Sequence, residues 1–120
     1  MRVFYVTLNT SDEARDLSRA LLERRLAVCC NWFPIACAYR SEAKVVEEVE
    51  TVLLVKTQAG YREHIEELVR QLVPYTNCVL EIRPESVNAR FGAWLDTEVP
   101  ATVPRLSSAL EAFDDEWDED

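Results

Sequence analysis

The chain has 120 residues, of which 48% are hydrophobic, and a formal net charge of -9. This size and apolar content predict one domain with a hydrophobic core and exclude a disordered chain, and no stretch approaches the ~20 apolar residues of a membrane span. Six of the 22 acidic residues lie within 114–120, so the rest of the chain has 16 acidic and 13 basic residues and is only mildly acidic. It contains no basic stripe, which argues against binding to nucleic acid.

The first predicted elements are a strand and an amphipathic helix. Residues 3–8 are apolar on both faces, which is typical of a covered strand. Thr10 and Glu13 have the spacing of a capping box at the start of a helix. One helical face then carries the apolar side chains that we expect to pack on the sheet, namely Ala14, Leu17, Leu21 and Leu22.

Two long apolar stretches, 26–39 and 45–55, come next. They are rich in β-branched residues and lack helical spacing, so they predict two long strands. Residues 40–44 then form the tip of a hairpin, and its geometry stays open because no Asn-Gly or Asp-Gly marks a tight turn. Consecutive apolar residues, as at 52–55, place apolar side chains on both faces of these strands.

The second half of the chain predicts one more full helix, a short strand and a brief helix. An apolar stripe runs along 61–72, and Pro74 ends that helix. Glu66 and Arg70, four residues apart, are expected to pair on its outer face, and His64 is expected at the surface or border of the stripe. A strand over 79–82 and a helical segment that begins near 84–86 and ends near 91–95 follow.

This order predicts an α+β protein, a ferredoxin-like βαββαβ sandwich with a long hairpin between its second and third strands. Its two main helices return to the same face of the sheet, so the other apolar face needs a partner, and we expect an oligomer with sheets packed face to face. The predicted domain covers 1–99. The remaining 100–120 form a C-terminal extension with an acidic tail, and 107–113 is either a short helix or loose.

A series of motifs between Val3 and Leu95 resembles the CutA family, the divalent-cation-tolerance proteins. Residues 26–31, LAVCCN, are similar to its L-A-A-C-x-N signature, and further matches follow in the family's order. The resemblance implies a ferredoxin-like homotrimer built on the long hairpin, a function in divalent cation tolerance or response, and no enzymatic activity. The further matches are Tyr39, Glu50, Lys56-Thr57, Pro74-Tyr75 and Trp94-Leu95.

The resemblance also suggests a metal site, with Cys29 as the ligand and a divalent metal such as copper as the cofactor. The chain departs from the family pattern around the other motifs. Ser41 and Ala43 stand where the family usually has tryptophan and glycine in the hairpin, while Val73 and Thr76 replace the histidine before and the glutamate after Pro-Tyr. Cys29 is therefore the soft ligand that this chain retains.

An alternative function is a PII-like trimeric regulator, related to nitrogen-signalling proteins of the same fold. Its intersubunit cleft would bind a small effector through Tyr39, Glu50, Lys56 and Tyr75, and Trp94 is a further cleft or interface residue. A protein partner is also left open. An enzyme ranks last, because a single histidine and unpaired thiols supply no nucleophile with a base and an orienting group.

The remaining polar and sulfur groups predict little chemistry of their own. Glu48 and Glu50 share one strand face, and ion pairs with Lys56, Arg40 or a neighbouring chain are favoured over a cation site. The four cysteines form no C-x-x-C pair and are expected as free buried thiols. The first ten residues lack the pattern of a signal peptide, so a cytoplasmic protein is expected.

Overall fold

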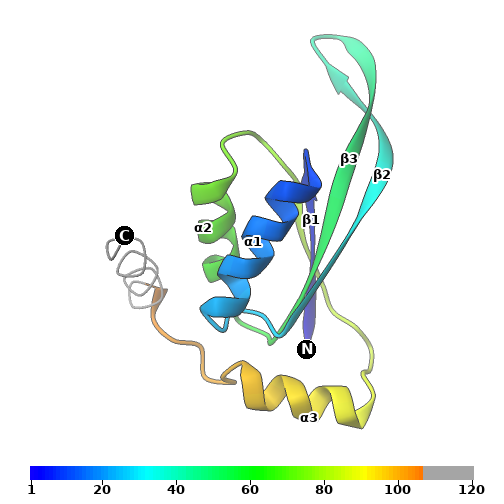
Figure 1. Ribbon diagram of the computed structural model, residues 1–120. Helices are drawn as coiled ribbons and strands as arrows, with labels where there is room; N and C mark the ends of the chain where they lie inside the picture. The colour runs from blue at the N-terminus through cyan, green and yellow to red at the C-terminus, as the bar shows by residue number, and fades with distance from the viewer. Residues whose placement is uncertain (107–120) are drawn as a thin grey trace.

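Four strands and three helices make up the computed structural model, which describes residues 1–106 (Figure 1). Helices and strands follow one another in the predicted order, with a third helix after the last strand. Residues 107–113 and the acidic tail lie outside the described residues. The elements are β1 (Arg2–Leu8), α1 (Ser11–Glu23), β2 (Cys29–Ser41), β3 (Lys44–Thr57), α2 (Arg62–Leu72), β4 (Val79–Ile82) and α3 (Ala89–Glu98).

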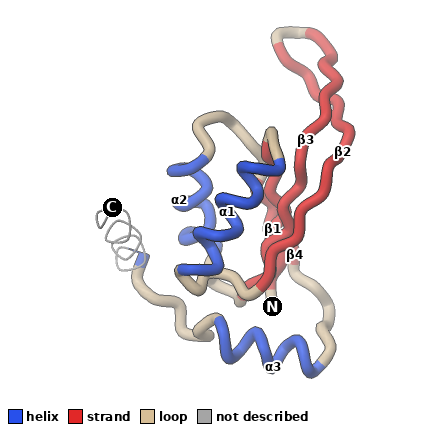
Figure 2. Tube along the Cα trace, in the orientation of Figure 1, coloured by secondary structure: helices blue, strands red, loops and turns tan. Residues whose placement is uncertain are grey.

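The strands form one antiparallel sheet in the order β2-β3-β1-β4. Figures 1 and 2 show α1 and α2 side by side on the same face of this sheet. The βαββαβ order and this strand order together confirm the predicted ferredoxin-like fold. None of the helices within residues 1–106 is long and apolar enough to cross a membrane.

Alternate residues of each strand point to opposite faces of the sheet. On β1, Phe4, Val6 and Leu8 are buried in the core that the two helices cover. We call the other side the open face; it carries Tyr5 on β1. Cross-strand register places further apolar side chains there, and three are well exposed: Phe33 at 43%, Leu80 at 50% and Ile82 at 44%. The strands are therefore apolar on both sides, as predicted.

The long hairpin is tighter than the sequence indicated. β2 and β3 stay paired from Cys29 and Lys56 to Ser41 and Lys44, so the turn consists of two residues. Glu42 and Ala43 both have positive φ, 51° and 65°, as a type I′ turn requires. The expected five-residue tip is wrong, because two non-glycine residues adopt the left-handed conformation.

The beginning of β2 also differs from the prediction. The strand starts at Cys29, and the preceding residues from Leu26 to Val28 form a buried connection. The hydroxyl of Thr57 donates a 2.7 Å hydrogen bond to the carbonyl of Leu26 and holds this connection against the end of β3. Pro34 is tolerated within β2 because the strand lies at the edge of the sheet, where a missing N–H costs no ladder bond.

The capping box of α1 is present as predicted: Glu13 N–H donates to the Thr10 hydroxyl, and Thr10 N–H donates to the Glu13 carboxylate. The predicted burial of Leu22 is wrong, since its side chain is 40% exposed near the end of the helix.

On α2 the expected pairing of Glu66 with Arg70 is also wrong. Arg70 bonds to Glu67 three residues earlier, and Glu66 lies 2.7 Å from Arg62. The observed pairs are four and three residues apart, and both spacings bring side chains together on a helix. The sequence therefore does not decide which glutamate Arg70 contacts; the side-chain rotamers do.

Helix α3 begins later than expected and extends to Glu98. In Figures 1 and 2 it crosses the end of the sheet at which the N-terminus lies. Leu95 is buried in the core, and the Arg25 guanidinium donates to the carbonyls of Thr97 and Glu98 at 2.9 and 2.8 Å. α3 therefore closes one end of the two-layer core.

Candidate functional site

A cavity of about 710 Å³ lies at the base of the long hairpin, between β2, β3 and the loop before β4. Cys37 and Tyr39 come from β2, and Glu48 and Glu50 come from β3. Cys37 pairs directly with Glu48 in the register, so these alternate side chains all point to the open face. The loop contributes Tyr75, Thr76, Asn77 and Cys78.

The two glutamates dominate the electrostatics of this cavity, since its other lining residues are neutral at pH 7. A hydrogen bond to the Glu48 carboxylate raises the pKa of Tyr39. Desolvation, followed by the hydrogen bond and negative charge of Glu50, raises the pKa of the Cys37 thiol. Both groups therefore stay protonated near neutral pH, and the two carboxylates keep a negative charge that attracts cations.

Tyr75 reaches the cavity with its ring, but its hydroxyl is already engaged. The hydroxyl donates a 2.8 Å hydrogen bond to Glu13 and accepts one of 2.9 Å from the backbone N–H of Asn9. Burial, with a further contribution from this bond to Glu13, raises the pKa of Tyr75 to about 12. Within the chain, Tyr75 thus shapes the rim of the cavity and does not present a free hydroxyl to a ligand.

The structure divides the predicted cleft residues into two groups. Tyr39, Glu50 and Tyr75 line the same cavity. Lys56 lies six residues beyond Glu50 on β3, about 20 Å away at roughly 3.3 Å per residue.

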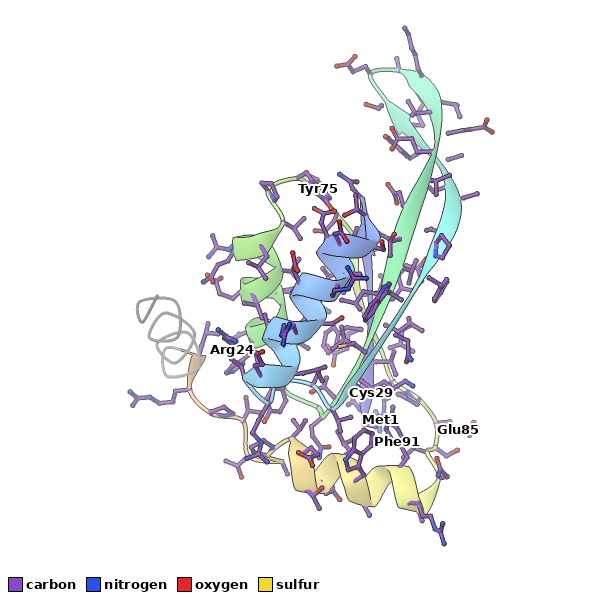
Figure 3. All side chains as sticks on the ribbon, in the orientation of Figure 1. Met1, Arg24, Cys29, Tyr75, Glu85 and Phe91 are labelled. Atoms are coloured by element: carbon purple, nitrogen blue, oxygen red, sulfur yellow. The ribbon has the colours of Figure 1, made fainter. Side chains whose placement is uncertain are left out.

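The second group lies at the α3 end of the sheet. Lys56 Nζ is 5.5 Å from the ring centroid of Phe91, whose ring meets that of Trp94 edge-on at 5.6 Å. Cys29 is opposite Lys56 in the register, and Figure 3 shows Cys29 and Phe91 at one end of the sheet and Tyr75 at the other. The functional roles of these residues remain predictions.

Sequence reasoning missed Cys37 and Cys78 as cavity residues. A usable signal was present for Cys37, because Cys37 and Tyr39 alternate on one strand as Glu48 and Glu50 do on the next. Whether the two pairs meet depends on the register, which a two-residue turn sets and a longer tip would shift. Cys78 immediately precedes β4, at the opposite edge of the sheet from β2, and the local sequence gives no indication that it lines the cavity.

A single chain does not assemble a complete transition-metal site in the described region. No three His, Cys, Asp or Glu side chains within residues 1–106 come close enough to hold an ion together. His64 is occupied, with Nε2 2.7 Å from the carbonyl of Pro104. His64 is 5% exposed, so the predicted surface or border position is wrong: residues near Pro104, far away in sequence, cover it.

The four cysteines are free thiols, as predicted, but their burial differs. Cys78 is exposed and Cys29, Cys30 and Cys37 are half-buried, so the expectation of four buried thiols is wrong. Cys30 lies beneath α1, where burial raises the pKa of its thiol to about 11. The raised pKa makes Cys30 a packing residue and a poor metal ligand, since metals bind the thiolate.

The chain belongs to the CutA1 divalent ion tolerance protein family, whose model matches residues 2–98. It is 40% identical over 75 residues to the divalent-cation tolerance protein CutA of Thermus thermophilus, covering 62% of this chain and 73% of that protein. It is 35% identical over 98 residues to the Protein CutA homolog of Xenopus laevis, covering 80% of this chain. That match spans 65% of the length of the Xenopus protein.

Solved structures agree with the sequence matches. The structure of the periplasmic divalent cation tolerance protein CutA from Archaeoglobus fulgidus superposes with a TM-score of 0.78 at 30% identity, covering 82% of this chain and 98% of that one. The family membership that the sequence motifs suggested is confirmed. It favours a protein of divalent cation tolerance over the PII-like regulator, the alternative prediction.

Proposed function

We propose that this chain acts in divalent cation tolerance without catalysis, and that its contact with cations lies in the cavity of Glu48 and Glu50. The observation that carries this proposal is the charge of the cavity: two carboxylates project from one face of β3 among lining residues that are neutral at pH 7. Such a cavity concentrates cations near it. A non-catalytic role is supported by His64, the single histidine of the chain, which is only 5% exposed and is therefore out of reach of a substrate.

A homotrimer is the proposed working form, with a cytoplasmic location. The exposed apolar side chains of the open face, including Phe33, Leu80 and Ile82, support association of copies of the chain. The threefold number comes from the family resemblance. Free thiols at all four cysteines support a reducing compartment, although the Archaeoglobus relative is named periplasmic.

The cavity offers two carboxylates and two thiols, Cys37 and Cys78, but no three of these four groups come close enough to chelate copper or zinc tightly. We therefore propose weak, exchangeable binding of hydrated divalent cations in each chain's cavity. Cys29, the ligand predicted from the family signature, lies on the open face opposite Lys56. The positive charge of Lys56 would repel a metal ion bound at Cys29. Cys29 remains the competing candidate for copper.

Calorimetric titration with copper and zinc tests this assignment. The wild type is compared with a Glu48→Gln/Glu50→Gln variant and with Cys29→Ser. If the cavity is the site, the double glutamine variant loses at least tenfold in affinity, and Cys29→Ser binds like the wild type. The opposite pattern would move the site to Cys29, and wild-type binding by both variants would overturn both assignments.

A further inference from the structure

A segment beyond the family match is packed against α2. The family model ends at residue 98, and the Archaeoglobus structure is 98% covered by a superposition that takes 82% of this chain. Residues 99–104, which we call the strap, therefore lie beyond the part that this chain shares with that relative. Figure 1 shows the chain turning back from the end of α3 towards α2 over this segment.

Two buried side chains hold the strap by its backbone carbonyls. The hydroxyl of Tyr61, a residue that is 0% exposed, donates to the carbonyl of Pro100 at 2.5 Å. His64 Nε2 lies 2.7 Å from the carbonyl of Pro104, and because a carbonyl only accepts, this nitrogen carries the proton. The two rings lie tilted against each other, with centroids 5.7 Å apart.

The middle of the strap fits a space that a glycine leaves. Gly60 has φ of +95°, and a Cβ added there would lie 2.8 Å from Cγ2 of Val103. At the start of the strap, Val99 is fully buried in the core, and its carbonyl accepts a 3.4 Å hydrogen bond from Gln58. The strap is thus held at both ends and in close contact at its centre.

We propose that Gly60, Tyr61 and His64 form a recognition groove for a short, bent segment containing two prolines, and that the strap occupies it in the same chain. Because the strap lies outside any helix or strand, the carbonyls of Pro100 and Pro104 are available to accept bonds from Tyr61 and His64. The groove supplies two donors from aromatic side chains and, at Gly60, room for an aliphatic contact. This combination matches VPATVP, the sequence of the strap.

The strap also leads the described part of the chain to its end at Leu106. Leu106 shares a shallow hollow with Glu63, Glu67 and Arg70 of α2, on the helical side of the sheet. The described part of the chain therefore ends beside α2, on the side of the sheet opposite the open face.

Trypsin cleavage after Arg105 tests the groove in the full-length chain. Arg105 is exposed and follows the last anchored residue, so cleavage reports release of the strap. Tyr61→Phe, which removes one anchoring bond, should speed this cleavage roughly fivefold, the equivalent of one net hydrogen bond. Tyr5→Phe, on the open face, is the matched control and should leave the rate unchanged. Equal rates in all three proteins would overturn the proposal.

A peptide experiment tests recognition separately from stability. A VPATVP peptide at millimolar concentration should compete with the tethered strap and speed cleavage after Arg105 in the wild type, because tethering gives the strap an effective concentration in that range. A scrambled peptide should have no effect. Absence of competition would overturn the proposed recognition, because the strap would then be held only by packing within the fold. A cleavage rate that falls as protein concentration rises would show that copies exchange their straps, which contradicts occupation within one chain.

Discussion

The hydroxyl of Tyr75 donates a 2.8 Å hydrogen bond to the carboxylate of Glu13, 62 residues earlier in the chain. Glu13 also accepts bonds from the backbone N–H groups of Asn9 and Thr10, at 2.9 and 3.1 Å. One carboxylate thus caps α1 and fastens the loop that follows α2. Because Tyr75 and Asn9 both line the cavity, this contact sets the shape of its rim.

Removing the Tyr75 hydroxyl should weaken this connection. We expect Tyr75→Phe to lower the free energy of unfolding by about 1 kcal/mol, since the partly buried Glu13 carboxylate loses one donor and the Asn9 N–H loses one of its two acceptors. Urea denaturation measures the change. Tyr39→Phe serves as the control, because Tyr39 is 41% exposed on the hairpin and should change stability much less. Equal losses in the two variants would contradict the structural role of Tyr75.

The turn of the long hairpin should accept a stabilising replacement. Glu42 and Ala43 have φ of 51° and 65°, a conformation that costs most residues energy and that Asn-Gly adopts readily. Glu42→Asn with Ala43→Gly should raise the free energy of unfolding by about 1 kcal/mol. Thermal unfolding checks this, with Ser41→Gly as the control, which adds a glycine to a strand and should destabilise. A lower melting temperature in the Asn-Gly variant would refute the turn assignment.

The thiols should differ strongly in reactivity. The pKa of Cys30 is raised to about 11 by burial, so at pH 8 only about one molecule in a thousand carries the thiolate. Its neutral form persists as pH rises until the pH approaches that value. Mass spectrometry after iodoacetamide treatment at pH 8 should find exposed Cys78 modified first and Cys30 last. Comparable rates in the folded protein would show that Cys30 is not buried as described.

The open face should control association. Leu80 is 50% exposed on β4, and Leu80→Glu would place a charge within the proposed sheet-to-sheet contact. We expect sedimentation equilibrium to show a trimer for the wild type and a monomer for this variant. Leu22→Glu, on the helical side, is the control and should remain associated. A wild-type monomer at micromolar concentration, or an unaffected Leu80→Glu variant, would remove the proposed trimer.

Much of the fold follows from local sequence patterns. The capping box at Thr10 and Glu13 and the strand over Val79–Ile82 appear where the pattern predicts them. The double-sided strands are also correct, because neighbouring residues of a strand point to opposite faces and a consecutive apolar run is therefore apolar on both. These features are decided by residues within a few positions of one another.

Tertiary structure decided the features that join distant residues. The burial of His64 depends on the carbonyl of Pro104, 40 residues later, and the engaged hydroxyl of Tyr75 depends on Glu13. The register of the hairpin, set by positive φ at Glu42 and Ala43, brings Cys37 beside Glu48 and leaves Lys56 at the far end of the strand. Hydrophobic periodicity identifies which face of an element is buried, but it carries no information about which polar groups from distant parts of the chain will contact that element. The candidate site is built from contacts of this second kind.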